Sequence, residues 1–574
     1  MVRIQDDLFE SVNGTWIEKT EIPADKPRIG SFDQLVIDIE ENLMADFATL
    51  EVDKVEEGAF KEFLKFYQQA GDFVTRDAAG VIPAQPRLEK IKGLTWSSFH
   101  SELKTLILNG FPTPFSLSIQ PDMKNTLTHA LYFGAPSLIL PDTTYYAEDH
   151  ADKAELLKVY QEMLAKLLRQ FNYSETEIER IITNTLHFDE LLVPVVNTSE
   201  EWAKYSELYN LKSWEAVQQD FSSLPISTVL AELVDASPDF IITEEPRFYQ
   251  SFNAIVNEGN WELIQSWLIA SEMTALGSYL TEEYRQIAGE FSRALSGIKE
   301  ARKQDKHAYD LATRTFSQAV GLYYGKKYFG DDAKADVLRM TKKMIGIYQE
   351  RLLANNWLTQ ATIDKAVVKL GKLEAMIGFP DKLPEIYHKL RVDLTKSLLE
   401  NAEEFSKLRI LESFAKFKQP VDRTEWHMPA HMVNAYFSPT SNQIVFPAAI
   451  LQAPFYSLEQ PTSANYGGIG AVIAHEISHA FDNNGALFDE YGNMNDWWTK
   501  EDKAAFEEKQ QAMIVEFDGL EIFERKVNGK LIVSENIADN GGMNAALTAA
   551  KSESDVDLQA FFKQWAEIWR IKVR

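Results

Sequence analysis

His475-Glu476-Ile477-Ser478-His479 places two imidazoles four residues apart in a chain of 574 residues. On a helix, that spacing puts both rings on one face, about 6 Å apart along the axis, so both can reach one small ion. Glu476 follows the first histidine and would lie beside a water molecule on that ion, where a carboxylate can accept and return a proton. The segment therefore predicts a zinc site with the chemistry of a hydrolase.

The residues around this segment favour a buried helix. Residues 471–474 are apolar, and further apolar residues interleave with the two histidines. Glycines within 467–470 predict the start of the helix, and Asn483-Asn484-Gly485 predicts its end. Two polar rings in a dry interior need partners, and a metal ion can supply them. The alternative is a chance pair of structural histidines.

The third ligand is not found close to the two histidines. A metzincin would require Gly and His where this chain has Asp482 and Gly485. A thermolysin-like spacing would require a glutamate near residues 497–499, which are Trp-Trp-Thr. The acids Asp482, Asp489 and Glu490 lie in a stretch rich in Asn and Gly, and we interpret them as solvated turn residues.

Glu535 is the better candidate for the third ligand. Ser534 is a suitable N-cap for a helix that begins at Glu535, and Asp539 then lies on the same face, four residues on. One carboxylate can bind the ion while the other accepts the remaining N–H of a metal-bound histidine.

Several further segments resemble one known family. The sequence is similar to the neprilysin family of zinc endopeptidases, and within it to the bacterial oligopeptidase branch called endopeptidase O. The similarity extends over nearly the whole chain. The segments that carry it are Val12–Trp16, Ile22–Asp25, Gly30–Phe32, Leu140–Asp142 with Tyr145-Tyr146, Ile377–Asp381, Asn442–Pro447, Val472–Asp482 and Glu535–Gly542.

The resemblance implies a role for each residue of the metal site. His475, His479 and Glu535 would bind one Zn²⁺, Glu476 would be the general base, and Asp539 would orient His475. Zinc would acidify its water and polarise the scissile carbonyl, while Glu476 would transfer the proton to the leaving amine. The implied reaction is hydrolysis of internal bonds in oligopeptide substrates.

A β-hairpin is predicted from residues 431–437 and 443–446, joined by the loop 438–442. An exposed edge there could pair with an extended peptide. The resemblance implies that Asn434 and Ala435 hold the substrate backbone. It also implies a hydrophobic pocket for the residue just after the scissile bond, and hence a preference for bulky apolar residues. The pocket residues are Ile450, Phe455, Ala471, Val472, Ile568 and Trp569, for which core packing is the alternative.

One feature departs from the family pattern. Relatives carry a histidine and an arginine beyond the region that resembles Ile568-Trp569, and these stabilise the oxyanion of the tetrahedral intermediate. No histidine follows His479 here. We expect either a chain truncated at its carboxy end or another group in place of these two. Loss of one oxyanion donor would lower kcat by about a hundredfold to a thousandfold. A catalytically weak, zinc-containing peptide-binding or adhesin-like protein is therefore an alternative. A zinc exopeptidase is a second, although no motif for holding a free terminus is found.

The predicted fold is mainly α (α+β), with two largely helical domains that enclose a central cavity. We expect an amino-terminal segment, 1–30, that packs with the catalytic domain, a helical cap domain, 31–400, and a thermolysin-like zinc catalytic domain with a small β element, 401–574. Helical periodicity is clear in 151–192, 202–221 and 261–280, and strand patterns occur mainly at 431–447 and 522–533. At this length two domains are expected.

Charge and composition bear on partners and location. The formal net charge of −28 argues against nucleic acid or an anionic membrane as a partner. No apolar run is long enough for a membrane span, the amino end lacks a signal-peptide core, and cysteine is absent. A cytoplasmic bacterial protein is the expectation. Export to the surface without a signal is the alternative.

Overall fold

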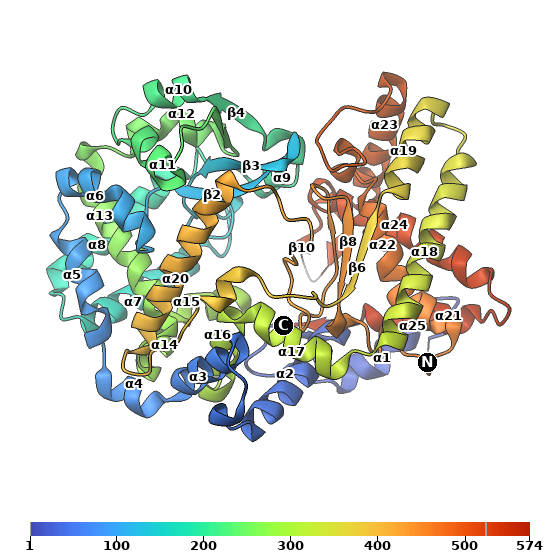
Figure 1. Ribbon diagram of the computed structural model, residues 1–574, viewed down its shortest axis with the longest axis horizontal. Coiled ribbons are helices and arrows are strands. Elements are labelled where there is room, and N and C mark those ends of the chain that lie inside the picture. Colours follow the sequence, from blue (N-terminus) through green and yellow to red (C-terminus); the bar gives the residue numbers. More distant parts are fainter. Residues whose placement is uncertain (1, 523–524) are drawn as a thin grey trace.

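The computed structural model describes residues 2–522 and 525–574. Buried apolar side chains form two large clusters, and Figure 1 shows the chain folded into two parts, one on each side of the view. We call the two parts the cap lobe and the catalytic lobe. The catalytic lobe contains α1 Leu8–Lys19, α2 Ser31–Thr49, α3 Ala59–Gly71, α16 Gln304–Thr315, α17 Ser317–Tyr328, α18 Asp331–Leu353, α19 Gln360–Gly371, α21 Thr462–Asn465, α22 Ala471–His479, α23 Lys500–Phe517, α24 Gly529–Lys551 and α25 Leu558–Ile568.

The cap lobe lies within residues 73–296. Its helices are α4 Phe73–Ala79, α5 Gln85–Gly93, α6 Trp96–Leu108, α7 Lys153–Gln170, α8 Glu175–Leu192, α9 Ser199–Trp202, α10 Trp214–Asp220, α11 Ile226–Val234, α12 Pro246–Ile255, α13 Trp261–Ala275, α14 Glu282–Ala288 and α15 Glu290–Ser296. Helix α20, Leu398–Ala415, contributes buried residues to both clusters. Within the catalytic lobe, helices α2, α3, α16 and α17 lie at the bottom of the view and extend toward the cap lobe (Figure 1). The prediction of a mainly helical, two-part fold is confirmed.

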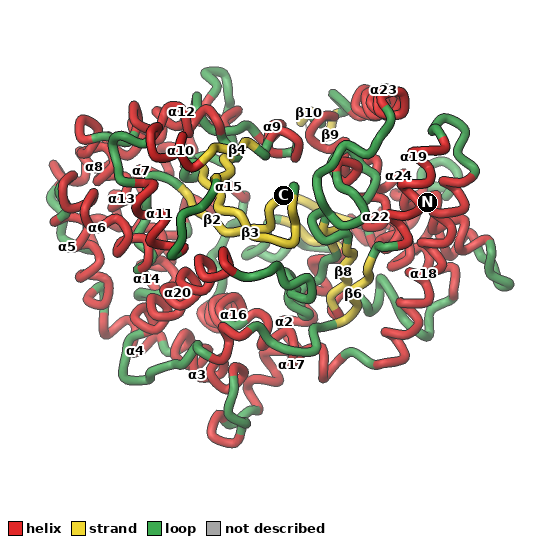
Figure 2. Tube along the Cα trace, turned by 45° about the horizontal axis from the view of Figure 1, so that its top comes forward, coloured by secondary structure: helices red, strands yellow, loops and turns green. Residues whose placement is uncertain are grey.

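Each lobe contains one small sheet, drawn in yellow in Figure 2. The cap sheet has the order β2 Ser116–Asp122, β3 Asn125–Gly134, β5 Phe240–Thr243 and β4 Asn210–Ser213. The sequence analysis missed this sheet, although Leu117 and Ile119 alternate with polar residues. The catalytic sheet has the order β6 Glu374–Gly378, β8 Gln443–Pro447 and β7 Tyr436–Ser438.

The hairpin predicted at 431–446 is present but shorter. Tyr436, Phe437 and Ser438 pair antiparallel with residues 443–445, whereas 431–435 lies outside any strand. Strand β8 is central and β7 is at the end of the sheet, so no further strand of the described residues pairs with the outer edge of β7.

The strand pattern predicted at 522–533 is wrong over most of its length. Two-residue strands, β9 Glu521–Ile522 and β10 Arg525–Lys526, pair antiparallel, and residues 523–524 lie outside the described residues. From Gly529 the chain is helical, because the Asn528 side chain caps α24 by accepting from the backbone N–H groups of Lys530 and Leu531. Ser534 is therefore not the predicted N-cap but lies inside the helix.

The amino-terminal segment contacts the carboxyl end of the described chain. Strand β1, Arg28–Gly30, pairs antiparallel with β11, Ile571–Val573. The amide of Asn13 donates to the Ala566 carbonyl at 2.8 Å, and the hydroxyl of Ser31 donates to the Glu567 carbonyl at 2.6 Å. The buried cluster of the catalytic lobe also includes residues of α2, α3 and α16–α18. The domain boundaries at 30 and 400 stay a prediction.

None of the helices within the described ranges is both long and apolar enough to cross a bilayer.

Candidate metal centre

Helix α22 presents His475 and His479 on one face, as the four-residue spacing predicts. The helix starts at Ala471, directly after the predicted glycines, and ends at His479, before the predicted Asn-Asn-Gly stop. Both rings bind a carboxylate through Nδ1. The Nδ1 atom of His475 lies 2.8 Å from Asp539, and that of His479 lies 2.6 Å from Asp482. With each Nδ1 donating, each Nε2 carries a free lone pair.

Helix α24 supplies the two carboxylates and packs closely on α22. Glu535, Asp539 and Gly542 occupy one face, at intervals of four and three residues. A Cβ on Gly542 would lie 2.7 Å from the backbone nitrogen of His475, so a side chain there would push the helices apart. The glycine thus allows the close approach that brings Glu535 to the histidines.

Three ligand atoms converge at one point. The two Nε2 atoms lie 2.9 Å apart, and an oxygen of Glu535 lies 3.3 Å from Nε2 of His475 and 3.7 Å from Nε2 of His479. Ligands about 2.1 Å from a tetrahedral Zn²⁺ lie about 3.4 Å from one another. Two imidazoles and a carboxylate are also a common catalytic zinc set, so these residues fit a zinc ion in chemistry and spacing.

Burial and the neighbouring carboxylates shift the pKa values of the two histidines in opposite directions. Burial lowers the pKa of His475, but hydrogen bonds to Asp539 and Glu535 outweigh it and raise the pKa to about 10. His479 follows the same pattern: burial lowers its pKa, and the hydrogen bond and charge of Asp482 raise it above the usual value. The site is therefore strongly anionic and suited to a divalent cation.

Glu476 lies beside the ligands, within the same cavity and 7% exposed. Burial raises the pKa of its carboxyl group, while the neighbouring His475 and His479 lower it. A carboxylate in a partly dry site is a stronger proton acceptor than one in water. Glu476 and the metal ligands line the same cavity, and its role as general base stays a prediction.

Asp482 is not the solvated turn residue that the sequence suggested. It is 3% exposed, and one of its oxygens accepts from His479 and from the hydroxyl of Ser534 at 2.7 Å. The other oxygen accepts from the backbone N–H groups of Asn484 and Gly485. Each histidine therefore has its own carboxylate partner, Asp539 for His475 and Asp482 for His479.

These two partners lead to a prediction about metal affinity. We expect Asp482→Asn and Asp539→Asn each to weaken zinc binding by about 10–100-fold, because the amide orients the ring but leaves the imidazole less basic. Competition with a chelator of known affinity measures this. The matched control is Asp364→Asn, an exposed carboxylate on α19. A wild-type zinc affinity in both variants would contradict the prediction.

The ligands open into a cavity of about 680 Å³. Residues from three distant parts of the chain line it: the amino-terminal segment, the cap lobe and the catalytic lobe. The lining residues are Arg28, Phe32, Tyr205, Asn434, Ala435, Tyr436, Phe437, Pro439, Ile450, Val472, His475, Glu476, His479, Asp482, Asn484, Gly485, Ser534, Glu535, Asp539 and Trp569.

The predicted substrate-binding residues fall into two groups. Asn434, Ala435, Ile450, Val472 and Trp569 line the cavity. The rest are buried in the core and do not line the cavity, and their contact with substrate stays a prediction; these are Phe455, Ala471 and Ile568.

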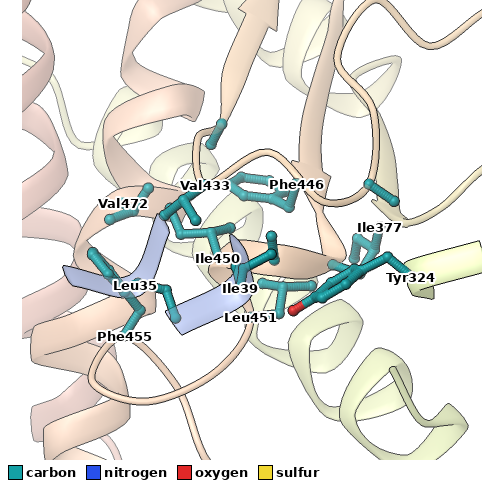
Figure 3. Packing of buried hydrophobic residues seen from close by; sticks show 14 of the residues in the cluster. Leu35, Ile39, Tyr324, Ile377, Val433, Phe446, Ile450, Leu451, Phe455 and Val472 are labelled. Carbon is teal, nitrogen blue, oxygen red and sulfur yellow. The ribbon is translucent and has the colours of Figure 1, made fainter. Parts of the chain in front are cut away.

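The core residues support the wall from behind. Leu35 of α2 lies among Ile450, Phe455 and Val472 (Figure 3). The ring of Phe455 packs edge-on against that of Phe32, with centroids 4.6 Å apart, and Phe32 itself lines the cavity.

Sequence reasoning missed three lining residues that are remote from the zinc motif. Arg28 and Phe32 flank Gly30-Ser31, which belongs to the amino-terminal segment that resembles the family, and this was the available signal. Tyr205 comes from the cap lobe, and no local pattern around it pointed to the site.

Comparison with known proteins agrees with this geometry. Two family models, both described as peptidase family M13, match residues 4–380 and 434–574. The chain belongs to peptidase family M13. The second match includes every proposed metal ligand, and the predicted neprilysin-type, bacterial endopeptidase branch is confirmed.

M13 relatives cover the whole chain. A neutral endopeptidase of Lactococcus lactis is 52% identical over 100% of this chain and 91% of its own length. A crystal structure of PEPO from Lactobacillus rhamnosis is 37% identical, with a TM-score of 0.97 over 100% of this chain and 91% of that one. The zinc metalloprotease ZMP1 of Mycobacterium tuberculosis, in complex with an inhibitor, is 28% identical with a TM-score of 0.91 over 100% and 90%.

The M13 matches and the site lead to the same conclusion. The chain is a zinc metalloendopeptidase with one Zn²⁺ as its cofactor. The M13 relatives do not favour the alternative of a catalytically weak peptide-binding or adhesin-like protein.

Proposed function

We propose that this endopeptidase hydrolyses internal bonds of oligopeptides and prefers a bulky hydrophobic residue just after the scissile bond. The observation that carries the proposal is the shared cavity, in which Glu476 and the metal ligands face an apolar wall. Phe32, Ile450 and Trp569 form part of that wall. An apolar side chain placed against these residues leaves water, whereas a charged one loses part of its hydration.

Each residue of the metal site has a proposed role. A zinc ion held by His475, His479 and Glu535 supplies a Lewis acid that polarises the carbonyl and lowers the pKa of water. Glu476 accepts the proton of the attacking water and passes it to the leaving amine. Asp539 holds the His475 ring in place through its Nδ1.

The edge strand β7 provides a way to hold the substrate backbone. Tyr436 and Phe437 of β7 line the cavity, so an extended peptide could pair with the strand beside Glu476. Asn434 is exposed, and its side-chain oxygen accepts from the N–H of Ala435 at 2.9 Å, which leaves its NH₂ group available. We propose that this group binds a peptide carbonyl.

Cleavage of a mixed library of peptides blocked at both ends tests this function. We expect cuts at internal bonds, with kcat/KM at least tenfold higher for Phe or Leu than for Asp or Lys just after the bond. Ile450→Ala should lower kcat/KM for the Phe and Leu peptides by several-fold, because it removes apolar contact area from the wall. Preference for charged residues would contradict the specificity, and a requirement for a free terminus would favour the exopeptidase alternative.

The remaining predictions concern nucleic-acid binding and the location of the protein in the cell. The absence of a nucleic-acid partner and the cytoplasmic location stay proposals that rest on the charge and composition of the chain.

A further inference from the structure

A short piece of the cap lobe, residues 200–205, bridges the two helices that carry the metal ligands. At the α24 end, the amide of Asn528 donates to Glu200 at 2.8 Å, and the Lys530 ammonium lies 3.8 Å from the same carboxylate. The same segment also contacts Asn484, which lies in the turn that follows His479 at the end of α22. Segment 200–205 therefore contacts the start of α24 and the turn that follows α22.

Asn484 forms a two-point clamp on this cap segment. Its side-chain NH₂ donates to the Ala203 carbonyl at 2.9 Å, and its side-chain oxygen accepts from the Tyr205 backbone N–H at 3.2 Å. Asn484 is 8% exposed, and its own backbone N–H donates to Asp482. Asn484 is thus hydrogen-bonded to the carboxylate that orients His479.

The clamp holds Tyr205 at the metal cavity. Tyr205 lines that cavity together with the metal ligands. Burial raises the pKa of its phenol, and the charges of Asp482 and Glu535 raise it further, so the hydroxyl stays protonated and can donate. Throughout residues 2–522 and 525–574, this hydroxyl makes no hydrogen bond with the protein.

We propose that Tyr205 is a substrate-contacting residue contributed by the cap lobe, whose hydroxyl donates a hydrogen bond to a bound oligopeptide, and that Asn484 is the residue that positions it. The acceptor is a backbone carbonyl, because every peptide offers one and the cavity already holds several carboxylates. Binding of substrate would then join the two lobes through the peptide itself. The proposal rests on the peptidase function described above.

The test measures both turnover and binding. The probe is a peptide of about ten residues, blocked at both ends, with a fluorophore and a quencher on either side of a Phe. We expect Tyr205→Phe to lower kcat/KM about tenfold through KM, with kcat, zinc content and thermal stability as in the wild type. In a Glu476→Gln background, which allows binding to be measured without cleavage, Kd for the same peptide should rise by the same factor. Tyr145→Phe, also in the cap lobe but outside the cavity, is the matched control.

A double-mutant cycle tests the part played by Asn484. Asn484→Ala should also raise Kd about tenfold, and adding Asn484→Ala to Tyr205→Phe should weaken binding little further, because both changes remove one contact. If the increase in Kd of the double variant equals the product of the two single increases, the positioning role of Asn484 would be overturned. A Kd for Tyr205→Phe equal to that of the control, or a loss confined to kcat, would overturn the contact itself. A wild type that binds the peptide but does not cleave it would count against the proposed function and leave the binding test intact.

Discussion

The Glu476→Gln variant is expected to keep its zinc, while its rate of peptide hydrolysis falls by at least about a thousandfold. Glutamine has the size of glutamate and can still accept one hydrogen bond, but it cannot take a proton from water. The three residues proposed to hold the metal are untouched, since Glu476 is not one of the converging donors. The change therefore separates proton transfer from metal binding.

The experiment compares single-turnover rates and metal content in the same preparations. Glu508→Gln, an exposed glutamate on α23, is the matched control and should behave as the wild type. Two results would contradict the assignment of Glu476 as base. One is turnover within tenfold of the wild type, and the other is loss of zinc together with activity, which would make Glu476 a structural residue of the site.

The metal site was predictable because the residues of each pair lie close together in the sequence. The spacing of His475 and His479 gives one helical face, and that of Glu535 and Asp539 gives another. Each pair needs only helix periodicity to be recognised. That the two helices meet was implied by the resemblance, and Gly542 shows the physical reason, since its missing side chain lets α24 lie against α22.

Residues joined to the site by long-range contacts were not predictable in the same way. Asp482 looks like a turn residue because its neighbours are polar, and its burial depends on Ser534 and on packing that no local pattern reports. Tyr205 reaches the cavity through a contact with Asn484, far away in sequence. The start of α24 was misplaced for a related reason: both Asn528 and Ser534 are good caps, and propensity alone does not choose between them.

The turn between the zinc helix and α23 depends on one buried lysine. Lys369 of α19 is 1% exposed, and its ammonium donates to three backbone carbonyls: Ala480 at 2.8 Å, Gly485 at 2.7 Å and Phe488 at 2.7 Å. Burial lowers the pKa of Lys369 to about 7, although nearby carboxylates, chiefly that of Asp482, raise it. The three bonds hold the loop that contains both Asp482 and Asn484.

Lys369→Met is expected to destabilise the protein by a few kcal/mol and to weaken zinc binding as well. Methionine fills a similar volume but donates no hydrogen bond, so the buried Ala480 carbonyl loses its donor at a cost of about 1–3 kcal/mol. The Gly485 and Phe488 carbonyls each lose one of two donors, since they also accept from the Phe488 N–H and from the Trp497 indole. The loss of the buried charge offsets part of this, because its desolvation no longer opposes folding. Once loop 480–488 is loosened, Asp482 no longer holds the His479 ring at a fixed angle, and the affinity for zinc falls.

Denaturant unfolding of the zinc-free protein measures the first effect, and chelator competition measures the second. Lys365→Met, at an exposed lysine one turn earlier on α19, is the matched control and should change neither quantity. Lowered stability with unchanged zinc affinity would mean that the loop orients His479 without Lys369. Unchanged stability would mean that the carbonyls find other donors, and the lysine would then have no part in shaping the metal site.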